Sequence, residues 1–413
     1  MTSAPQRRFA WTLATLLFAG SVLNYVDRSI LGVLMPPIRR DLSLSNEQYG
    51  YAVNAFLMLY AVFYVLGGKM SDRLGYKPTV FWSVLFWSAA NALHALATGL
   101  RSLCFFRALL GIGEGVFYPA AIRCYTEWFP PASRAKAVGL LLSGLSVGTL
   151  VTPPVAAWIL VHWGWRAAFV VTGAAGLLLL PPWILLHRGV NPSPRAEEAA
   201  QVAGLSGITL GEVLRHRRFW AVLGARAVGD AAWYFYLFWM PGYFQEVREF
   251  DPAMVGKYLW VPYFCAGAGA LAGAWASSAL ISRGIQPERS RKSVLFPSAV
   301  CASLGALAFL ADHPAAALAL ASVALFGHQS WSSNLHTVIT EICPPEHVAV
   351  LYGITGAAGT LAGALSQPLI GRVVDFQGYG PAFAAAGLAY FAAIVLLLAA
   401  GRLAPIRVSS MRK

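Results

Sequence analysis

Apolar segments of about 20 residues follow one another along almost the whole chain, with only short polar stretches between them. A helix of this length crosses a hydrocarbon layer about 30 Å thick. Of the 413 residues 57% are hydrophobic and only 12% are charged. Globular domains carry about 25% charged residues, so this chain lacks the residues for a polar shell. The sequence therefore predicts an all-α membrane protein with many spans.

One long polar linker, rich in Pro, Gly and charged residues, divides the apolar segments into two groups of six. We predict an N-terminal six-helix bundle over 1–187, a cytoplasmic linker over 188–218 and a C-terminal six-helix bundle over 219–413. A short surface helix is expected to begin near Ser206. The twelve predicted transmembrane helices are 9–32, 50–68, 79–98, 102–125, 137–159, 166–186, 219–244, 254–281, 293–311, 315–338, 348–370 and 380–402.

The net charge of +13 is explained by orientation in a membrane. If the helices alternate from a cytoplasmic N-terminus, the cytoplasmic loops hold roughly twenty Lys and Arg residues and the outer loops about seven, as the positive-inside rule requires. We therefore predict a multi-pass protein of the cell (inner) membrane with both termini cytoplasmic, and no nucleic-acid partner. The five cysteines lack metal-type spacing and are interpreted as reduced packing residues.

The two halves show an internal repeat. A shift of 214 residues lays "TEWFPPASRAKAVG" (126–139) over "TEICPPEHVAVLYG" (340–353), with coincident Thr, Glu, two Pro, Ala and Gly. The same shift places Gly113 on Gly327 and Glu114 on His328. Duplicated bundles are common in transporter folds, so the repeat favours two pseudo-symmetric halves.

Ionisable residues in the first and fourth segments are the main functional candidates, because a charge at mid-membrane costs at least about 2.5 to 3.5 kcal/mol. Helical spacing places Asn24, Asp27 and Arg28 on roughly one face, with Tyr25 beside them. The fourth segment has a matching stripe of Arg107, Glu114 and Tyr118.

Two interpretations of these charges are open. A buried ion pair, Asp27 with Arg107 or Arg28 with Glu114, would fix helix register, although buried pairs stabilise proteins poorly. Alternatively, burial favours the neutral form of a carboxyl group, so that it can bind and release protons during a transport cycle. Under this hypothesis Asp27 and Glu114 carry protons and Arg28 binds an anion.

The second half presents uncharged polar and aromatic groups at corresponding places. Hydroxyl, amide and imidazole groups suit a polyhydroxylated or carboxylated small molecule, and aromatic rings suit the apolar face of a sugar. The alternative is ordinary hydrogen bonding between helices. Arg226 and Asp230 are interpreted as an internal pair. The candidate substrate contacts here are Trp233, Tyr234, Gln329, Trp331, Asn334 and His336.

Enzyme signatures are absent from the sequence. No glycine loop for phosphate follows a strand, and no nucleophile has a partner base, so we predict no enzyme activity, no cofactor and no metal. His94, His162 and His187 lie near the predicted helix ends and are interpreted as interfacial or loop residues.

The segment "GGKMSDRLGYKP" (67–78) resembles the signature loop of the major facilitator superfamily, and "RALLGIGEG" resembles its fourth-helix motif. "NYVDR", "GIGEGVFYP" and "EWFPPASRAKAVG" together resemble the anion:cation symporter family within it. The resemblance implies two rocking six-helix bundles, proton coupling at Asp27 and Glu114, and anion contact by Tyr25, Arg28 and Tyr60. It also implies a gating latch formed by Gly68, Asp72, Arg73 and Gly75.

We therefore predict a monomeric, proton-coupled secondary transporter that imports a small organic anion, a sugar acid such as a hexuronate or aldonate, by alternating access. Arg107 and Tyr118 are included among its substrate contacts. The alternatives are a proton-coupled exporter of a metabolite or drug, an importer of an aromatic acid or monocarboxylate, and a transporter-like receptor. Leu145 and Gly356 depart from the polar contacts of some sugar-acid carriers, which leaves the substrate open.

Overall fold

The computed structural model describes residues 4–129, 131–188, 210–343 and 348–403. All regular structure within these ranges is helical, which confirms the predicted fold class. Most of the predicted linker, including the proposed start of a surface helix at Ser206, lies outside the described residues. A short helix, α9 (Leu210–Leu214), follows it.

The first six predicted spans correspond to helices that begin and end close to the predicted bounds. The sixth span is formed by the end of α6 together with α7, since Gly164 has φ 79° and breaks α6 into two helices. The short helix α2 and the 3₁₀ turn η1 connect spans. The elements are α1 (Ala4–Val33), α2 (Met35–Leu42), α3 (Asn46–Leu74), α4 (Tyr76–Leu93), η1 (His94–Leu96), α5 (Leu100–Trp128), α6 (Pro131–Leu177) and α7 (Leu180–Leu186).

The last six spans follow the same pattern, with two of them built from a short helix joined to a long one. The elements are α10 (Arg217–Phe238), α11 (Met240–Glu246), α12 (Pro252–Tyr258), α13 (Trp260–Ser282), α14 (Pro287–Ser303), η3 (Leu304–Ala308), α15 (Pro314–Ile342), α16 (Val348–Gln377) and α17 (Gly380–Ala400). Seven described helical stretches are long and apolar enough by themselves to cross a membrane, and one of these, Lys136–Leu186, contains two of the spans.

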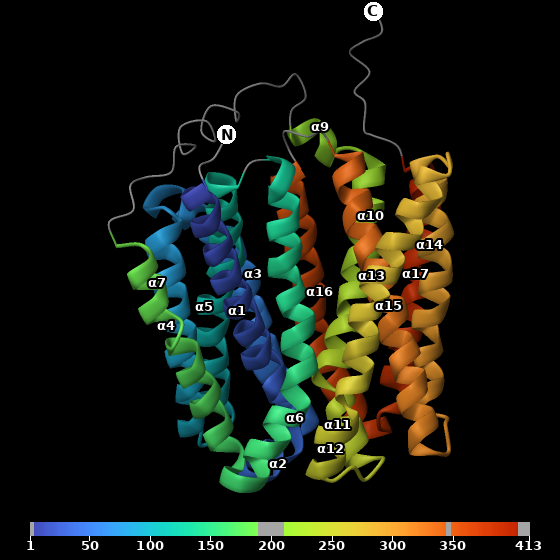
Figure 1. Cartoon of the computed structure of the whole chain (residues 1–413). Helices are drawn as coiled ribbons and strands as arrows, with labels where there is room; N and C mark the ends of the chain where they lie inside the picture. Colours follow the sequence, from blue (N-terminus) through green and yellow to red (C-terminus); the bar gives the residue numbers. More distant parts are fainter. Residues whose placement is uncertain (1–3, 130, 189–209, 344–347, 404–413) are drawn as a thin grey trace, which may run out of the picture. The chain divides into compact units, whose positions relative to one another are not determined.

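The described helices fall into two compact units. The first contains α1 to α7 together with α11 and α12, and the second contains α9, α10 and α13 to α17. Within the first unit α1 lies beside α6 (Figure 1). Within the second unit α10 packs on α16 and α17. Each unit is a helical bundle with its own buried core.

Small residues set the closest helix contacts of the first unit. A Cβ atom on Gly148 of α6 would lie 2.5 Å from the Val22 carbonyl oxygen of α1, so α6 approaches α1 closely only because residue 148 is glycine. Gly111 and Gly115 of α5 allow an equally close approach to the backbone of α3. Cβ atoms on them would lie 2.3 Å and 2.8 Å from carbonyl oxygens of α3. Such small-residue contacts are typical of helix packing in membranes.

The internal repeat is visible in the packing. A Cβ atom on Gly113 of α5 would lie 2.8 Å from the Cβ of Trp87 on α4, and one on Gly327 of α15 would lie 2.8 Å from the Cβ of Cys301 on α14. Trp87 and Cys301 are themselves 214 residues apart. The crossing of the third and fourth spans is therefore repeated in the ninth and tenth.

Candidate functional site

Arg28 of α1 and Glu114 of α5 form a buried ion pair in the first unit. The Nε and Nη2 atoms of Arg28 donate to Oε2 of Glu114 at 3.0 Å and 2.9 Å, and the two side chains are 2% and 0% exposed. Of the two pairings considered from the sequence, the structure shows this one. Each side chain is the charged partner of the other inside the bundle. If Glu114 loses its charge, Arg28 can therefore bind another anion.

Three aromatic rings surround the Arg28 guanidinium group. Its central carbon lies 4.6 Å from the ring centre of Tyr25, 4.3 Å from that of Tyr60 and 5.3 Å from that of Phe56. Phe56 and Tyr60 belong to α3, the helix that Gly111 and Gly115 allow to pack closely against α5. The rings hold the cation by its faces and leave its edge for oxygen ligands, an arrangement suited to a planar carboxylate.

Asp27 points to a different set of partners. Its Oδ1 accepts a hydrogen bond from Nδ2 of Asn91 at 2.7 Å, and the same nitrogen donates to Oγ1 of Thr172 at 2.7 Å and to the Phe169 carbonyl oxygen at 3.3 Å. Asp27 is fully buried, and no cationic side chain of the described residues lies within ion-pair distance of it. The adjacent residues Asp27 and Arg28 of α1 thus have different partners, Asn91 of α4 and Glu114 of α5.

Arg107 is a fully buried cation of α5. Within the part of the chain that the structure describes, none of its three guanidinium nitrogens has a hydrogen-bond acceptor, and its guanidinium carbon lies 4.3 Å from the ring centre of Phe56. Its charge interacts at longer range with those of Glu114 and Asp27. The four buried charges Asp27, Arg28, Arg107 and Glu114 sum to zero when both carboxyl groups are ionised.

Tyr118, one turn beyond Glu114 on α5, shares a hydrogen bond of 2.8 Å with the hydroxyl group of Ser21 on α1. Its side chain is 7% exposed, as is that of Tyr60, another predicted substrate contact in this unit.

In the second unit, aromatic stacking accounts for part of the predicted set. Trp233 stacks on His328 with ring centres 5.0 Å apart, and Nδ1 of His328 lies 2.6 Å from the Tyr390 hydroxyl oxygen. Trp331 is buried beside Tyr390, and Gln329 is partly exposed. At the repeat position of Glu114, the buried imidazole of His328 therefore lies among aromatic rings and forms no ion pair with any described residue.

The remaining residues of the second unit lie in polar networks. The Asn334 side chain donates to the Ser330 carbonyl oxygen at 3.0 Å and accepts from Arg291, which pairs with Glu341 at 2.8 Å. His336 lies against the Tyr352 ring, and Tyr234 against Gly363. Arg226 contacts Asp230 at 3.4 Å, as the internal-pair interpretation expected, and also donates to Thr355 at 2.8 Å.

The signature loop connects α3 and α4. Gly75, at φ 82°, makes the sharp turn that a residue with a side chain adopts only with strain. Asp72 pairs with Arg123 of α5, and Arg123 also pairs with Glu127 at 2.8 Å. Gly68 has open space around it, and Arg73 is exposed. An ion pair thus joins the end of α3 to α5.

Sequence reasoning missed Asn91 and Thr172, the residues that hold Asp27. It interpreted His94 and His187 as interfacial or loop residues near helix ends; both do lie at helix ends, and their side chains are 0% and 3% exposed. His94 stacks on Phe169 at 4.8 Å and bonds to the carbonyl groups of its own helix end. The available signal was a cluster of polar residues, "SAANALH", inside an apolar segment.

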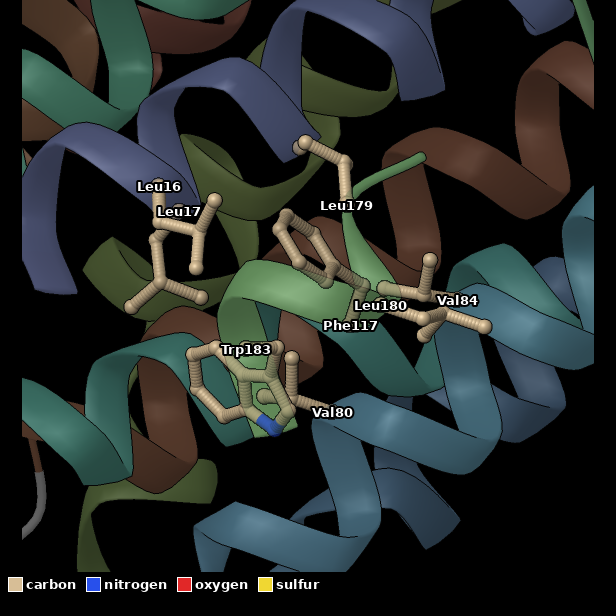
Figure 2. A pocket seen from close by; sticks show the side chains of 9 residues that line it. Leu16, Leu17, Val80, Val84, Phe117, Leu179, Leu180 and Trp183 are labelled. Carbon is tan, nitrogen blue, oxygen red and sulfur yellow. The ribbon is translucent and has the colours of Figure 1, made fainter. Parts of the chain in front are cut away.

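A separate pocket in the first unit is entirely apolar (Figure 2). It opens where α6 ends and α7 begins, and its lining residues are Leu16, Leu17, Gly20, Val80, Val84, Phe117, Leu179, Leu180 and Trp183. Its lining offers no charged group for an anion. Among the described residues no group of three or more His, Cys, Asp or Glu side chains is placed to hold a metal ion.

Comparisons with known proteins agree with this architecture. The model of the Major Facilitator Superfamily matches residues 17–367. The chain is 27% identical over 388 residues to the hexuronate transporter of Escherichia coli (strain K12), covering 91% of this chain and 90% of that protein. It is 30% identical over 417 residues to the D-galactonate transporter of Escherichia coli O6:H1 (strain CFT073), covering 95% and 94%.

A solved structure gives the same fold. A bacterial homolog of the human lysosomal transporter Spinster superposes with a TM-score of 0.76 and 21% identity, covering 97% of this chain and 96% of that one. The helical bundles, their buried charges and these relatives define a membrane transporter that is not an enzyme. The chain belongs to the Major Facilitator Superfamily and is a multi-pass inner-membrane protein.

Proposed function

We propose that this transporter imports a small organic anion of the sugar-acid class together with protons, by alternating access of its two halves. The observation that supports it best is the buried pair of Arg28 and Glu114 inside a ring of aromatic side chains. The curated relatives, named for hexuronate and D-galactonate, support the substrate class.

The coupling follows from competition for one cation. While Glu114 is ionised, it occupies the donor edge of Arg28 that a substrate carboxylate needs. A proton on Glu114 removes its charge and weakens both hydrogen bonds, because hydrogen bonds to charged groups are the stronger ones. Arg28 then binds the carboxylate of the substrate. Proton binding and anion binding therefore favour each other, which is the linkage that symport requires.

Charge balance supports the same assignment. The buried cluster is neutral with both carboxyl groups ionised, so an added anion needs at least one proton if the loaded site is to stay neutral. Asp27 and Glu114 are the two buried carboxyl groups available in this cluster. We place both termini on the cytoplasmic side, in line with the distribution of basic residues.

The test is uptake into proteoliposomes with an imposed inward proton gradient, using glucuronate and galactonate as probes. We expect the wild-type protein to concentrate at least one of them, and Glu114→Gln and Asp27→Asn to bind it without accumulation. Asp312→Asn, which changes an exposed carboxyl group between η3 and α15, is the matched control. Accumulation by Glu114→Gln would overturn the proton assignment, and faster loss of preloaded probe under the inward gradient would favour export.

A further inference from the structure

Asn91 and Thr172 have no place in the function proposed above, although both lie directly behind Asp27. Asp27, Asn91 and Thr172 are 0%, 0% and 4% exposed, and they come from α1, α4 and α6. One amide nitrogen links all three, because Nδ2 of Asn91 lies 2.7 Å from both the Asp27 carboxyl and the Thr172 hydroxyl oxygens.

The packing of α6 on α4 fixes this arrangement. A Cβ atom on Gly173 would lie 2.6 Å from the Ser88 carbonyl oxygen, and one on Gly176 would lie 2.1 Å from the Ser88 hydroxyl oxygen. The two glycines therefore admit α6 to contact distance just where Thr172 faces Asn91. The close approach of α6 to α4 therefore brings the Thr172 hydroxyl group to the Asn91 amide that bonds to Asp27.

The two oxygens of the Asp27 carboxyl group differ in their surroundings. Oδ1 accepts the Asn91 hydrogen bond, whereas Oδ2 is buried and makes no hydrogen bond of standard geometry among the described residues, although the Thr172 hydroxyl group and the Trp87 indole also act on the carboxyl group. An amide N–H donates to a carboxylate and also to the carbonyl oxygen of a neutral carboxylic acid, although more strongly to the former. The bond to Oδ1 can therefore persist while Oδ2 gains or loses a proton.

We propose that Asn91, oriented by Thr172, is a positioning residue that anchors Asp27 through Oδ1 in both protonation states and sets the pH at which Oδ2 takes up its proton. This inference rests on the proposed role of Asp27 as a proton carrier. An arginine in the place of Asn91 would hold Asp27 ionised, whereas a neutral amide lets it exchange a proton without moving.

The charged and titratable groups facing Asp27 are few. They are Arg107 and Glu114 of α5, together with Arg28, the next residue of α1, which turns to Glu114, whereas the buried His94 of η1 lies close to Arg107. Besides Asn91, the uncharged side chains that interact with Asp27 are Thr172 of α6 and the Trp87 indole of α4, and Phe169 of α6 contributes only a carbonyl oxygen to Asn91. Protonation therefore has different consequences at the two carboxyl groups: at Glu114 it releases an arginine, and at Asp27 it changes the charge with little rearrangement.

The test is an infrared titration of the purified protein in lipid, following the C=O stretch of protonated carboxyl groups without any substrate. The component absent from Asp27→Asn reports Asp27. In Asn91→Leu, loss of the donor favours the neutral acid, so we expect its midpoint to move to higher pH by about one to two units, the equivalent of one charge-assisted hydrogen bond. Thr172→Val should move it in the same direction by less, and Thr172→Ser should restore it.

Thr79→Val, which changes another buried hydroxyl group of α4, one that bonds to the Gly75 carbonyl oxygen and not to α6, is the matched control and should leave the midpoint unchanged. An Asp27 component that titrates at the same pH in wild type, Asn91→Leu and Thr172→Val would overturn the inference. Absence of any Asp27 component in the wild type would instead overturn the proposed proton role. If Asn91→Leu does not fold, the comparison of Thr172→Val with Thr172→Ser decides the question alone.

Discussion

The substitution Glu114→Gln tests how Arg28 is shared between the protein and its substrate. In the wild type two hydrogen bonds, of 3.0 Å and 2.9 Å, join Arg28 to the Glu114 carboxylate. The carboxylate of the substrate must displace these bonds, so Arg28 exchanges one charged partner for another. A glutamine of the same shape keeps an oxygen that accepts from Arg28 but carries no charge.

The size of the effect follows from the difference between a charged and a neutral acceptor. Arg28 stays charged, so its bonds to a glutamine oxygen are still charge-assisted, and only the attraction to the carboxylate charge is lost. Since ionisation of one partner adds roughly 1–2 kcal/mol to a hydrogen bond, the competing interaction weakens by about 1–2 kcal/mol. At about 1.4 kcal/mol for each factor of ten, Glu114→Gln should bind a sugar-acid probe about 5- to 30-fold more tightly at alkaline pH. At acidic pH, where wild-type Glu114 is protonated, the difference should disappear.

The assay is isothermal titration calorimetry of glucuronate and galactonate against purified protein across the pH range. Glu127→Gln is the matched control, because Glu127 lies on the same helix but pairs with Arg123. Size-exclusion profiles check that the loss of a buried partner for Arg28 has not unfolded the protein. Equal or weaker alkaline affinity in a folded Glu114→Gln protein would refute the competition argument.

Three further predictions concern single groups. Tyr60→Leu should weaken probe binding by roughly 0.5–2 kcal/mol, measured by calorimetry, because the ring 4.3 Å from Arg28 is lost, whereas Tyr60→Phe should retain most of the affinity. Gly363→Ala should lower the unfolding temperature, since its Cβ would lie 2.2 Å from Tyr234, whereas Gly353→Ala, with open space around it, should not. Asp41 of α2 bonds to the guanidinium group of Arg166 and the indole of Trp165, both of α6, and these bonds lower the pKa of its carboxyl group. The contribution of Asp41 to stability is therefore present above the unfolded pKa of about 3.9 and is lost as pH falls through the lower folded value. The difference in unfolding temperature between wild type and Asp41→Asn should therefore vanish in strong acid, and a difference that persists there would contradict the assignment.

The sequence was sufficient for the fold because membrane spans leave a direct signal in apolar length. The bounds of α1, α4 and α5 lie within a few residues of the predicted spans. The break at Gly164 falls in the predicted turn between the fifth and sixth spans. The repeat of 214 residues likewise reappears as matching contacts of Gly113 and Gly327.

The partners within the site could not be predicted in the same way. Helical spacing places Asp27 and Arg28 on nearly the same face, but it does not show that one side chain turns to α5 and the other to α4. That choice depends on how closely neighbouring helices approach, which Gly111, Gly173 and Gly176 decide through contacts with other helices. A buried asparagine such as Asn91 has no local pattern that separates it from ordinary polar contacts between helices.

The most direct test of the central claim is the number of protons taken up when the substrate binds. It is measured by calorimetry of one sugar-acid probe in buffers of different ionisation enthalpy, at a pH where wild-type Glu114 is largely ionised. We predict net proton uptake by the wild type and a clear reduction in Glu114→Gln. Binding that takes up no proton in the wild type at any pH would contradict the account.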